Sequence, residues 1–488
     1  MKKYLLLIAT STVFASCSKW LDVTPKSDVS ETSLFNTEDG FKDALNGLYS
    51  RCIQHDLYGR DLSVGTLDVL AQNYNIAFND GLGYLQTSLF NYENESFISR
   101  KDQYWNGLYN VIANSNQILN KVDEKRSLMT DMSYGMFKGE ALAMRAYCHF
   151  DLLRMFAPSF VTGANQDGIP YLTTFSKDIT PQSTVTEDLD FIIKDLKEAK
   201  DLLKTIDPIL TAAYVVGYPD GDSTTETEGR DLFIQNRRHR LNYYAVCAEL
   251  ARVYLYKGEY QLALDEAEEV IHSNKFPFTK QTDFMNPNEE LRDRINYNEL
   301  VFAFYAASSS NTLNDQFRRS PSQSLTISTT NGRSLYEVAG VGAEDFRFKQ
   351  WFSEQAENTG TYLRLEKYKR DPDANLHPQV IPGIRLSEVY YIAAECLFDQ
   401  DPGKAWEYFN TVRKYRGIGQ ELSDPDKTFF MKELVKEARK EMYGEGQIFY
   451  MYKRLNIPLQ SPTGSTFPVN NNIFVFPLPD DEISFGNR

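Results

Sequence analysis

The chain has 488 residues, of which 42% are hydrophobic and 24% are charged, a composition typical of folded proteins and not of disordered ones. Its 67 acidic residues outnumber 52 lysines and arginines, and the net charge of −15 argues against nucleic acid as a ligand, because phosphate neutralisation needs clustered basic side chains. Its 31 Phe, 30 Tyr and 4 Trp residues provide 65 aromatic rings, which favours a neutral or apolar-faced ligand.

The N-terminus has the pattern of an export signal. Two lysines precede an apolar run that is too short to span a bilayer, and small residues follow it. The pair Ala15-Ser16 directly before Cys17 resembles a bacterial lipobox. This resemblance implies that residues 1–16 are a signal peptide, that Cys17 is lipidated, and that residues 17–30 form a tether. An ordinary signal peptide cut nearby is the alternative.

Helical patterns begin after the tether, in the part of the chain that we expect to form one domain over 31–488. Thr37 and the two acidic residues after it are typical of a helix N-terminus before an apolar face that starts at Phe41. A pair of helices is then expected over about 104–157. The second helix ends before Pro158, because proline cannot continue a helix.

The middle of the chain contains an internal repeat. Ala251 and Ala263 stand twelve positions apart on either side of a turn at Gly258, and Ala393 and Ala405 stand at the same spacing. Small residues in this register resemble the tetratricopeptide (TPR) helix pair, although generic amphipathic helices are the alternative. We therefore predict TPR-like helices over about 104–157, 187–204, 241–272, 385–416 and 427–455.

Three insertions separate these helices, over about 71–100, 205–236 and 274–382. They are rich in Asn, Gly and Ser, and the last contains strand-like runs at 300–305 and 324–328. Long structured loops on a rigid scaffold are where binding surfaces commonly lie. The insertions are therefore the first place to look for a ligand site.

Familiar catalytic and metal-binding motifs are not evident in the sequence. There is no Cys-x-x-Cys pair, no His-Glu-x-x-His and no Gly-x-Ser-x-Gly. The cysteines beyond Cys17 lie mostly in apolar helical patterns and are expected to be buried. We therefore predict no catalytic residue, no metal and no cofactor.

Four segments, in this order, resemble a known family. They are Leu21–Lys26 (LDVTPK), Gly139–Arg154 (GEALAMRAYCHFDLLR), Arg385–Glu395 (RLSEVYYIAAE), and the C-terminal run Glu437–Glu441 (EARKE) closed by Phe476–Glu482 (FPLPDDE). On these residues the chain resembles the SusD/RagB family of outer-membrane lipoproteins. The fold class expected is mainly α, a TPR-like right-handed α-superhelix with long loop-rich insertions that carry a few short strands.

The resemblance also implies a function. SusD-like proteins bind oligosaccharides, or peptides in some members, and form a hinged lid on a SusC-like TonB-dependent β-barrel transporter. The chain is then expected at the outer membrane facing the cell exterior, held by its lipid anchor only, as a nutrient-uptake protein without catalysis. The alternatives are the same scaffold binding peptides, a TPR scaffold with only protein partners, and a surface glycan hydrolase.

Two of the insertions carry the chemistry that a sugar ligand needs. Aromatic faces match the flat C–H faces of sugar rings, and nearby amides and hydroxyls can satisfy the sugar hydroxyls. The first insertion holds a ring-and-amide loop that includes Phe78, and the third holds a further ring cluster. The candidate ligand-binding residues are Tyr74, Asn75, Tyr84, Tyr336 and Trp351. The alternative is that these rings only pack the insertions themselves.

Overall fold

The computed structural model describes residues 34–218, 224–229, 231–306, 312–357, 360–369, 377 and 380–486. The signal peptide 1–16, the lipidation site Cys17 and the tether 17–30 lie outside these described residues and stay predictions.

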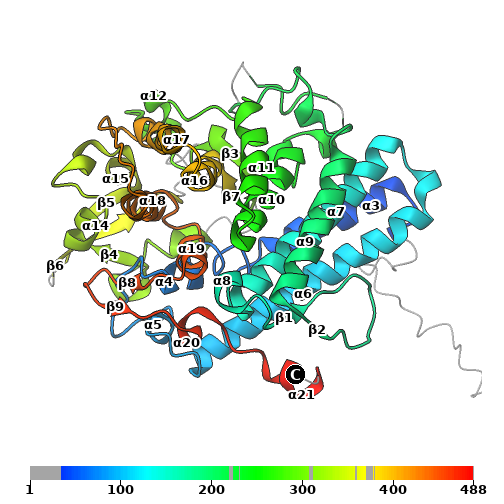
Figure 1. Ribbon diagram of the computed structural model, residues 1–488, viewed down its shortest axis with the longest axis horizontal. Helices are drawn as coiled ribbons and strands as arrows, with labels where there is room; N and C mark the ends of the chain where they lie inside the picture. The colour runs from blue at the N-terminus through cyan, green and yellow to red at the C-terminus, as the bar shows by residue number, and fades with distance from the viewer. Residues whose placement is uncertain are drawn as a thin grey trace, which may run out of the picture.

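Long helices at the N-terminal side of the chain pack against one another on the right of the view in Figure 1. They are α3 (Glu38–Cys52), α6 (Glu95–Glu124), α7 (Asp131–Phe156) and α9 (Val185–Leu203). Thr37 caps α3 as predicted, because its side-chain oxygen accepts a hydrogen bond of 3.1 Å from the Gly40 amide. Helix α6 starts nine residues before the predicted position, since Asn94 caps it by accepting from the Ser96 amide.

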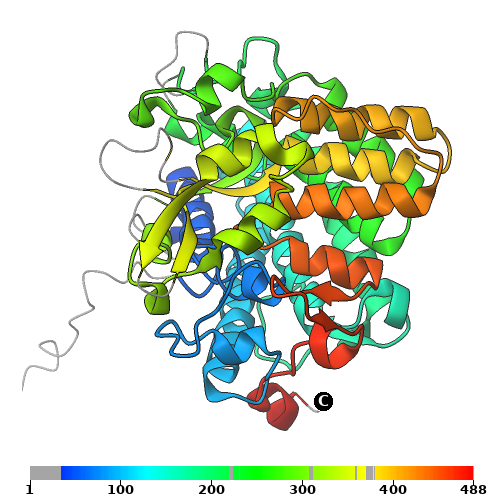
Figure 2. The same cartoon turned by 90° about the vertical axis from the view of Figure 1, so that its left-hand side faces the viewer.

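The repeat predicted from the small residues forms two pairs of adjacent helices, which a third pair follows. The pairs are α10 (Tyr243–Lys257) with α11 (Tyr260–His272), α16 (Leu386–Leu397) with α17 (Pro402–Tyr415), and α18 (Lys427–Glu441) with α19 (Ile448–Leu455). Gly258 has a φ of 79° at the first turn, and the four repeat alanines are fully buried. In Figure 2, α16 to α19 lie one above another as orange and yellow rods. The predicted mainly α fold with TPR-like helix pairs is confirmed.

Short antiparallel strands belong mainly to the insertions. The pairs are β1 (Asp167–Pro170) with β2 (Gln182–Thr184), β3 (Leu300–Tyr305) with β7 (Val380–Arg385), and β8 (Leu459–Gln460) with β9 (Thr466–Phe467); β6 (Gly360–Leu365) lies between β4 (Thr326–Ser328) and β5 (Phe352–Glu357). The strand-like runs predicted near 300–305 and 324–328 correspond to β3 and β4.

Short helices connect these elements. They are α4 (Thr66–Leu70), α5 (Leu85–Ser88), α8 (Phe160–Gly163), α12 (Gln281–Phe284), α13 (Thr312–Asp315), α14 (Thr329–Leu335), α15 (Phe346–Trp351), α20 (Asn471–Phe474) and α21 (Asp480–Phe485).

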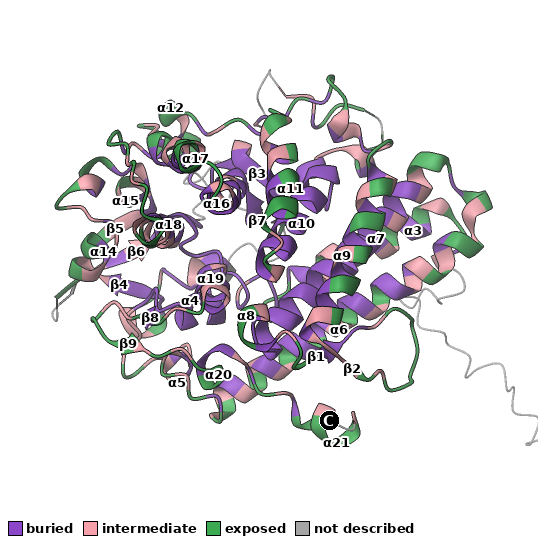
Figure 3. Ribbon diagram, viewed as in Figure 1, coloured by how far each residue is buried: buried purple, intermediate pink, exposed green. Residues whose placement is uncertain are grey.

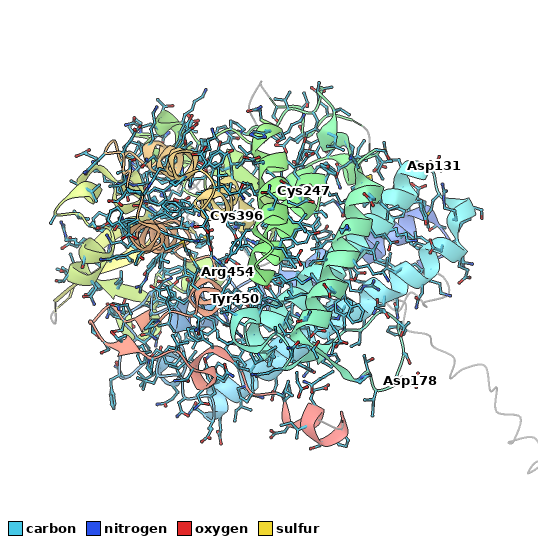
Figure 4. All side chains as sticks on the ribbon, in the orientation of Figure 1. Asp131, Asp178, Cys247, Cys396, Tyr450 and Arg454 are labelled. Carbon is cyan, nitrogen blue, oxygen red and sulfur yellow. The ribbon has the colours of Figure 1, made fainter. Side chains whose placement is uncertain are left out.

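One apolar core extends through the helices and reaches into the insertions, as the distribution of buried residues shows (Figure 3). Cys52, Cys148, Cys247 and Cys396 are buried free thiols, as expected; Figure 4 labels two of them, on α10 and α16. Within the described ranges, no helix is both long enough and apolar enough to cross a bilayer.

A buried network of ion pairs connects the third insertion to α18. Glu441 on α18 accepts hydrogen bonds from Arg347 at 3.0 Å, from Arg416 at 2.7 Å, and from Arg385. Arg347 also binds Glu437 at 2.8 Å, and every one of these side chains is at least 97% buried. Although burial alone would raise the pKa of Glu441, the three guanidinium groups hold it well below its usual value.

Removing the charge of Glu441 should destabilise the fold strongly. We expect Glu441→Gln to lower the free energy of unfolding by about 3–5 kcal/mol, because it leaves buried guanidinium groups without a counter-charge. Urea denaturation followed by circular dichroism measures the change. The matched control is Glu354→Gln, whose partner Arg333 lies 3.4 Å away with both side chains about half exposed, and which should cost no more than about 1 kcal/mol. Equal losses of unfolding free energy in the two variants would contradict a stabilising role of the buried network.

Candidate functional site

The four rings predicted to contact a ligand are buried in the structure. The exposed fraction is 4% for Tyr74, 1% for Tyr84, and 0% for both Tyr336 and Trp351. A stacked sugar needs an open ring face, and none of the four offers one in this structure. Their burial therefore supports the packing alternative, and the expectation that these rings form the stacking surface gains no support.

Polar partners inside the protein explain why three of these rings can be buried, whereas the Tyr74 hydroxyl has no hydrogen-bond partner among the described residues. The Tyr84 hydroxyl donates to the Asp61 carboxylate, and the Tyr336 hydroxyl donates to the Lys440 carbonyl at 2.9 Å. The Trp351 indole donates to the Arg294 carbonyl at 2.6 Å. A tyrosine or tryptophan whose polar tip is satisfied internally can serve as a core residue. Burial and, next, the Asp61 charge raise the pKa of Tyr84 well above its usual value, so that it stays a neutral donor.

Asn75 joins the first insertion to the third. Its backbone amide donates to the Thr326 carbonyl at 2.8 Å. Its side-chain oxygen accepts from the Ser328 backbone amide at 2.8 Å and from the Asn331 side-chain amide at 3.1 Å. These bonds cover the outer edge of β4, and α4 and α5 lie on the same side of the molecule as β4 (Figure 1). Asn75 therefore positions one predicted ligand-determining insertion against another.

The loop between α4 and α5 carries one ring that is almost fully exposed. The side chain of Phe78 is 93% exposed, the largest value among the exposed large hydrophobic residues of the described chain. A phenylalanine in this state loses the free energy that burial would give it. A ring presented to solvent on an ordered loop is the surface that a stacked ligand requires.

Three sets of hydrogen bonds hold this loop in place. The Asp80 carboxylate accepts from the amides of Leu82 at 2.9 Å and Leu85 at 3.0 Å. The Gly81 amide donates to the Ser322 carbonyl at 2.6 Å. On the other side, the Arg100 guanidinium donates to two loop carbonyls and stacks 4.0 Å from the Tyr84 ring centroid. Phe78 is thus exposed at the apex of a fixed loop.

Exposed polar side chains lie on the loop that carries Phe78 and beside that loop. Asn79 follows it in the chain, and Gln323 lies beside Gly81 across the contact between the two insertions. Amides of this kind can donate to and accept from sugar hydroxyls. We name Phe78, Asn79 and Gln323 the Phe78 platform. Among the described residues, no cluster of His, Cys, Asp or Glu is placed to hold a metal ion.

Sequence reasoning included Phe78 in the ring-and-amide loop but selected its tyrosine neighbours. The sequence contains a feature that distinguishes the exposed Phe78 from the buried Tyr74 and Tyr84. Phe78 directly precedes Asn79-Asp80-Gly81, which are turn residues, whereas Tyr74 and Tyr84 lie nearer the ends of the loop, where the chain returns to the apolar core.

The protein also has a hollow beside helix α18. It is a groove of about 880 Å³ between α14, α18 and the chain that follows α19. Its wall is mainly aliphatic: Ile327, Leu335, Met431, Val435, Leu455 and Ile457. Arg439 borders the groove and donates to the Gln72 carbonyl at 2.6 Å and to the Asn73 side chain at 3.1 Å. Arg439 therefore links the groove to the segment that leads into the Phe78 loop.

Two family models match the chain. One, described as "Starch-binding associating with outer membrane", matches residues 19–210, and the other, described as "SusD family", matches residues 350–482. Two SusD-like proteins of Formosa agariphila, P38 and P25, are 25% identical over 300 residues and 22% identical over 288 residues. These matches cover 60% and 57% of this chain but only 49% and 48% of the relatives, so the chain spans about half of their length.

Solved structures show the same fold. A SusD superfamily protein of Bacteroides thetaiotaomicron has a TM-score of 0.72 at 23% identity, over 92% of this chain and 98% of that one. A SusD-like carbohydrate-binding protein of Bacteroides vulgatus has a TM-score of 0.71 at 18% identity, over 92% and 97%. A laminarin-binding SusD-like protein has a TM-score of 0.62 at 20% identity, over 92% and 97%.

The resemblance predicted from four sequence segments is therefore confirmed at both ends of the chain and over its fold. The chain belongs to the SusD/RagB family, a family of outer-membrane-associated, carbohydrate-binding proteins.

Proposed function

We propose that this protein captures an oligosaccharide at the cell surface by stacking it on the Phe78 platform and delivers it to a SusC-like TonB-dependent transporter. It acts as a binding protein and not as a catalyst. Two observations support this function: the family binds carbohydrate, and this chain exposes the Phe78 ring. Lipidation of Cys17 would hold it on the outer membrane, facing the exterior.

The observation that carries the proposal is the 93% exposure of Phe78 on a loop fixed by Asp80 and Ser322. Because hydrogen bonds already order the loop backbone, stacking a ligand on the ring restricts only the rotamers of the Phe78 side chain. The ligand gains the apolar contact that the protein itself does not use. Asn79 and Gln323 supply hydrogen bonds to the hydroxyl edge of the sugar.

Loss of the Phe78 ring should weaken glycan binding. Laminarin oligosaccharides and maltooligosaccharides are the probes, because a structural neighbour is described as laminarin-binding and a matching family model as starch-binding. For whichever probe binds, we expect Phe78→Ala to raise the Kd about tenfold, which corresponds to about 1.4 kcal/mol, and Phe78→Trp to retain binding. Isothermal titration calorimetry measures both.

The matched control is Phe485→Ala on α21, which removes another exposed ring, 74% accessible, far along the chain. It should leave the Kd unchanged. An unchanged Kd for Phe78→Ala with a glycan that the wild type binds would overturn the platform. Failure of the wild type to bind any member of a broad glycan array would overturn the glycan ligand.

The start of the platform loop depends on a buried carboxyl. Asp68 on α4 accepts from the Asn73 side chain at 2.7 Å, and the Asn73 amide donates to the Asp68 carbonyl at 3.1 Å. Burial raises the pKa of Asp68 to about 8 from an ordinary value of 3.8, although the Asn73 hydrogen bond acts in the opposite direction. The folded state therefore favours the protonated carboxyl.

This raised pKa predicts a loss of stability with rising pH. Because the folded-state pKa is higher than the unfolded one, the contribution of Asp68 is complete below about pH 4 and is lost as the pH rises through about 8. We expect Asp68→Asn to stabilise the protein relative to wild type at pH 8 and to change it little at pH 4. Urea denaturation across this range tests the difference; a wild-type-minus-variant stability that does not change with pH would contradict it.

The aliphatic groove favours a peptide as the second candidate ligand. Its one aromatic lining residue, Tyr452, is 95% buried, so the groove offers no platform to a sugar. Lys432 is exposed on its rim, whereas the neighbouring Lys436 is paired with Glu337 and Glu433 at 2.9 Å; the exposed lysine suits acidic peptides with apolar side chains.

Charge and shape changes in the groove should separate the two candidates. We expect the double variant Lys432→Glu/Val435→Asp to weaken binding of labelled acidic, leucine-rich peptides at least tenfold in fluorescence anisotropy, and to leave glycan binding unchanged. Lys414→Glu, an exposed lysine on α17, is the matched control. Peptide binding that is absent in the wild type, or equal in both variants, would remove this candidate.

A further inference from the structure

Two cysteines from distant parts of the chain meet in the core between α3 and α7. Cys52 is the last residue of α3, and Cys148 lies in the second half of α7. The two helices pack against each other on the right of Figure 1, and both thiols are fully buried. The fold therefore brings together two side chains that are 96 positions apart in the sequence.

A third sulfur shows where the Cys52 thiol lies. The Cys52 thiol donates to the Met144 Sδ at 3.7 Å. Met144 and Cys148 are one turn apart on α7, so their side chains lie on the same face of that helix. The Cys52 sulfur is thus placed beside the face of α7 that carries Cys148. The Cys148 thiol in turn forms a hydrogen bond with the Cys52 side chain.

The other two buried cysteines are differently placed. Cys247 lies on α10 and Cys396 on α16. The groups that shift the pKa of Cys247 and of Cys396 are charged residues and a tyrosine, not a second cysteine. These two thiols are therefore natural controls for Cys52 and Cys148, because they are as well buried but lie apart from another sulfur.

The folded protein keeps the Cys148 thiol unreactive. Burial raises the pKa of Cys148 well above its usual value, and the neighbouring Cys52 raises it further. Since the thiolate is the form that attacks a disulfide, a protonated thiol in the core reacts slowly. Oxidation of this pair therefore belongs to the folding of the chain, before the core closes around it.

We propose that Cys52 and Cys148 form a disulfide while the exported chain folds, and that this bond fixes α3 to α7. The oxidant is an external disulfide, carried by a small molecule or by a thiol–disulfide oxidoreductase. The thiolate of one cysteine attacks it, forming a mixed disulfide and releasing one thiol. The second cysteine thiolate attacks the mixed disulfide and releases the other thiol. Two protein thiols are oxidised, and one external disulfide is reduced to two thiols.

The bond would constrain the part of the chain that carries the platform. The covalent loop from Cys52 to Cys148 contains the first insertion with Phe78 and all of α6. Closing a long loop lowers the conformational freedom of the unfolded chain and so favours the folded state. The inference rests on export into an oxidising compartment, which the outer-membrane association of the family supports, and not on the identity of the ligand.

Peptide mapping tests the bond directly. The full chain is purified after export, alkylated in urea without reductant and digested with trypsin. Cleavage after arginine releases Cys52 in the peptide 52–60 and Cys148 in the peptide 146–154. We expect mass spectrometry to find these two peptides joined, and to find Cys247 and Cys396 alkylated. Alkylation of Cys52 and Cys148 to the same extent as Cys247, or a link between any other pair, would overturn the proposal.

Stability provides a second test that does not depend on the digest. We expect a reductant to lower the urea midpoint of the exported wild type, because it opens the covalent loop. The midpoint of Cys52→Ala should be the same with and without reductant, whereas Cys247→Ala, the matched control, should keep the reductant effect of the wild type. A wild-type midpoint that does not respond to reductant would contradict the disulfide, while leaving glycan binding and the Phe78 platform untouched.

Discussion

The buried ion pairs of the EARKE segment on α18 connect the parts of this protein that sequence periodicity does not describe. Glu437 and Glu441 bind Arg347, Arg385 and Arg416, and the first two of these arginines come from the third insertion and from the strand that ends it. Because the carboxylates and guanidinium groups are buried together, none of them can be left alone without a large desolvation penalty. The insertion is therefore fixed to the helical scaffold by electrostatics as well as by apolar packing.

The two basic residues of the same segment, Arg439 and Lys440, bind the first insertion and another part of the third. Arg439 donates to the Gln72 carbonyl and to the Asn73 side chain, at the start of the first insertion. Lys440 binds Glu337 in the third insertion at 2.7 Å. One helical turn of charged residues thus holds both insertions that meet at the platform. This explains physically why such a polar segment lies in the interior of the protein, where a helix would otherwise present apolar side chains.

Sequence patterns predicted the scaffold better than the site. The spacing of Ala251, Ala263 and Gly258 determines how two helices pack and turn, and all three are local features that the sequence states directly. The fate of an aromatic ring in an insertion depends instead on distant partners. Tyr336 is buried because the Lys440 carbonyl, 104 positions away, accepts its hydroxyl hydrogen bond. No pattern within the insertion contains that information.

The same reasoning distinguishes Phe78 from the tyrosines that flank it. A tyrosine can be buried with its hydroxyl satisfied, so a loop tyrosine is compatible with either outcome, as Tyr84 and Asp61 illustrate. The exposure of Phe78 is determined by the backbone of its loop instead. Asp80 fixes the turn after Phe78, and the Gly81 amide binds the neighbouring insertion. The loop is therefore ordered without any contribution from the Phe78 ring. Side chains at the apex can then change without unfolding the loop that presents them. A scaffold whose insertions are fixed by buried charges can in this way accept different apex residues while its fold stays the same.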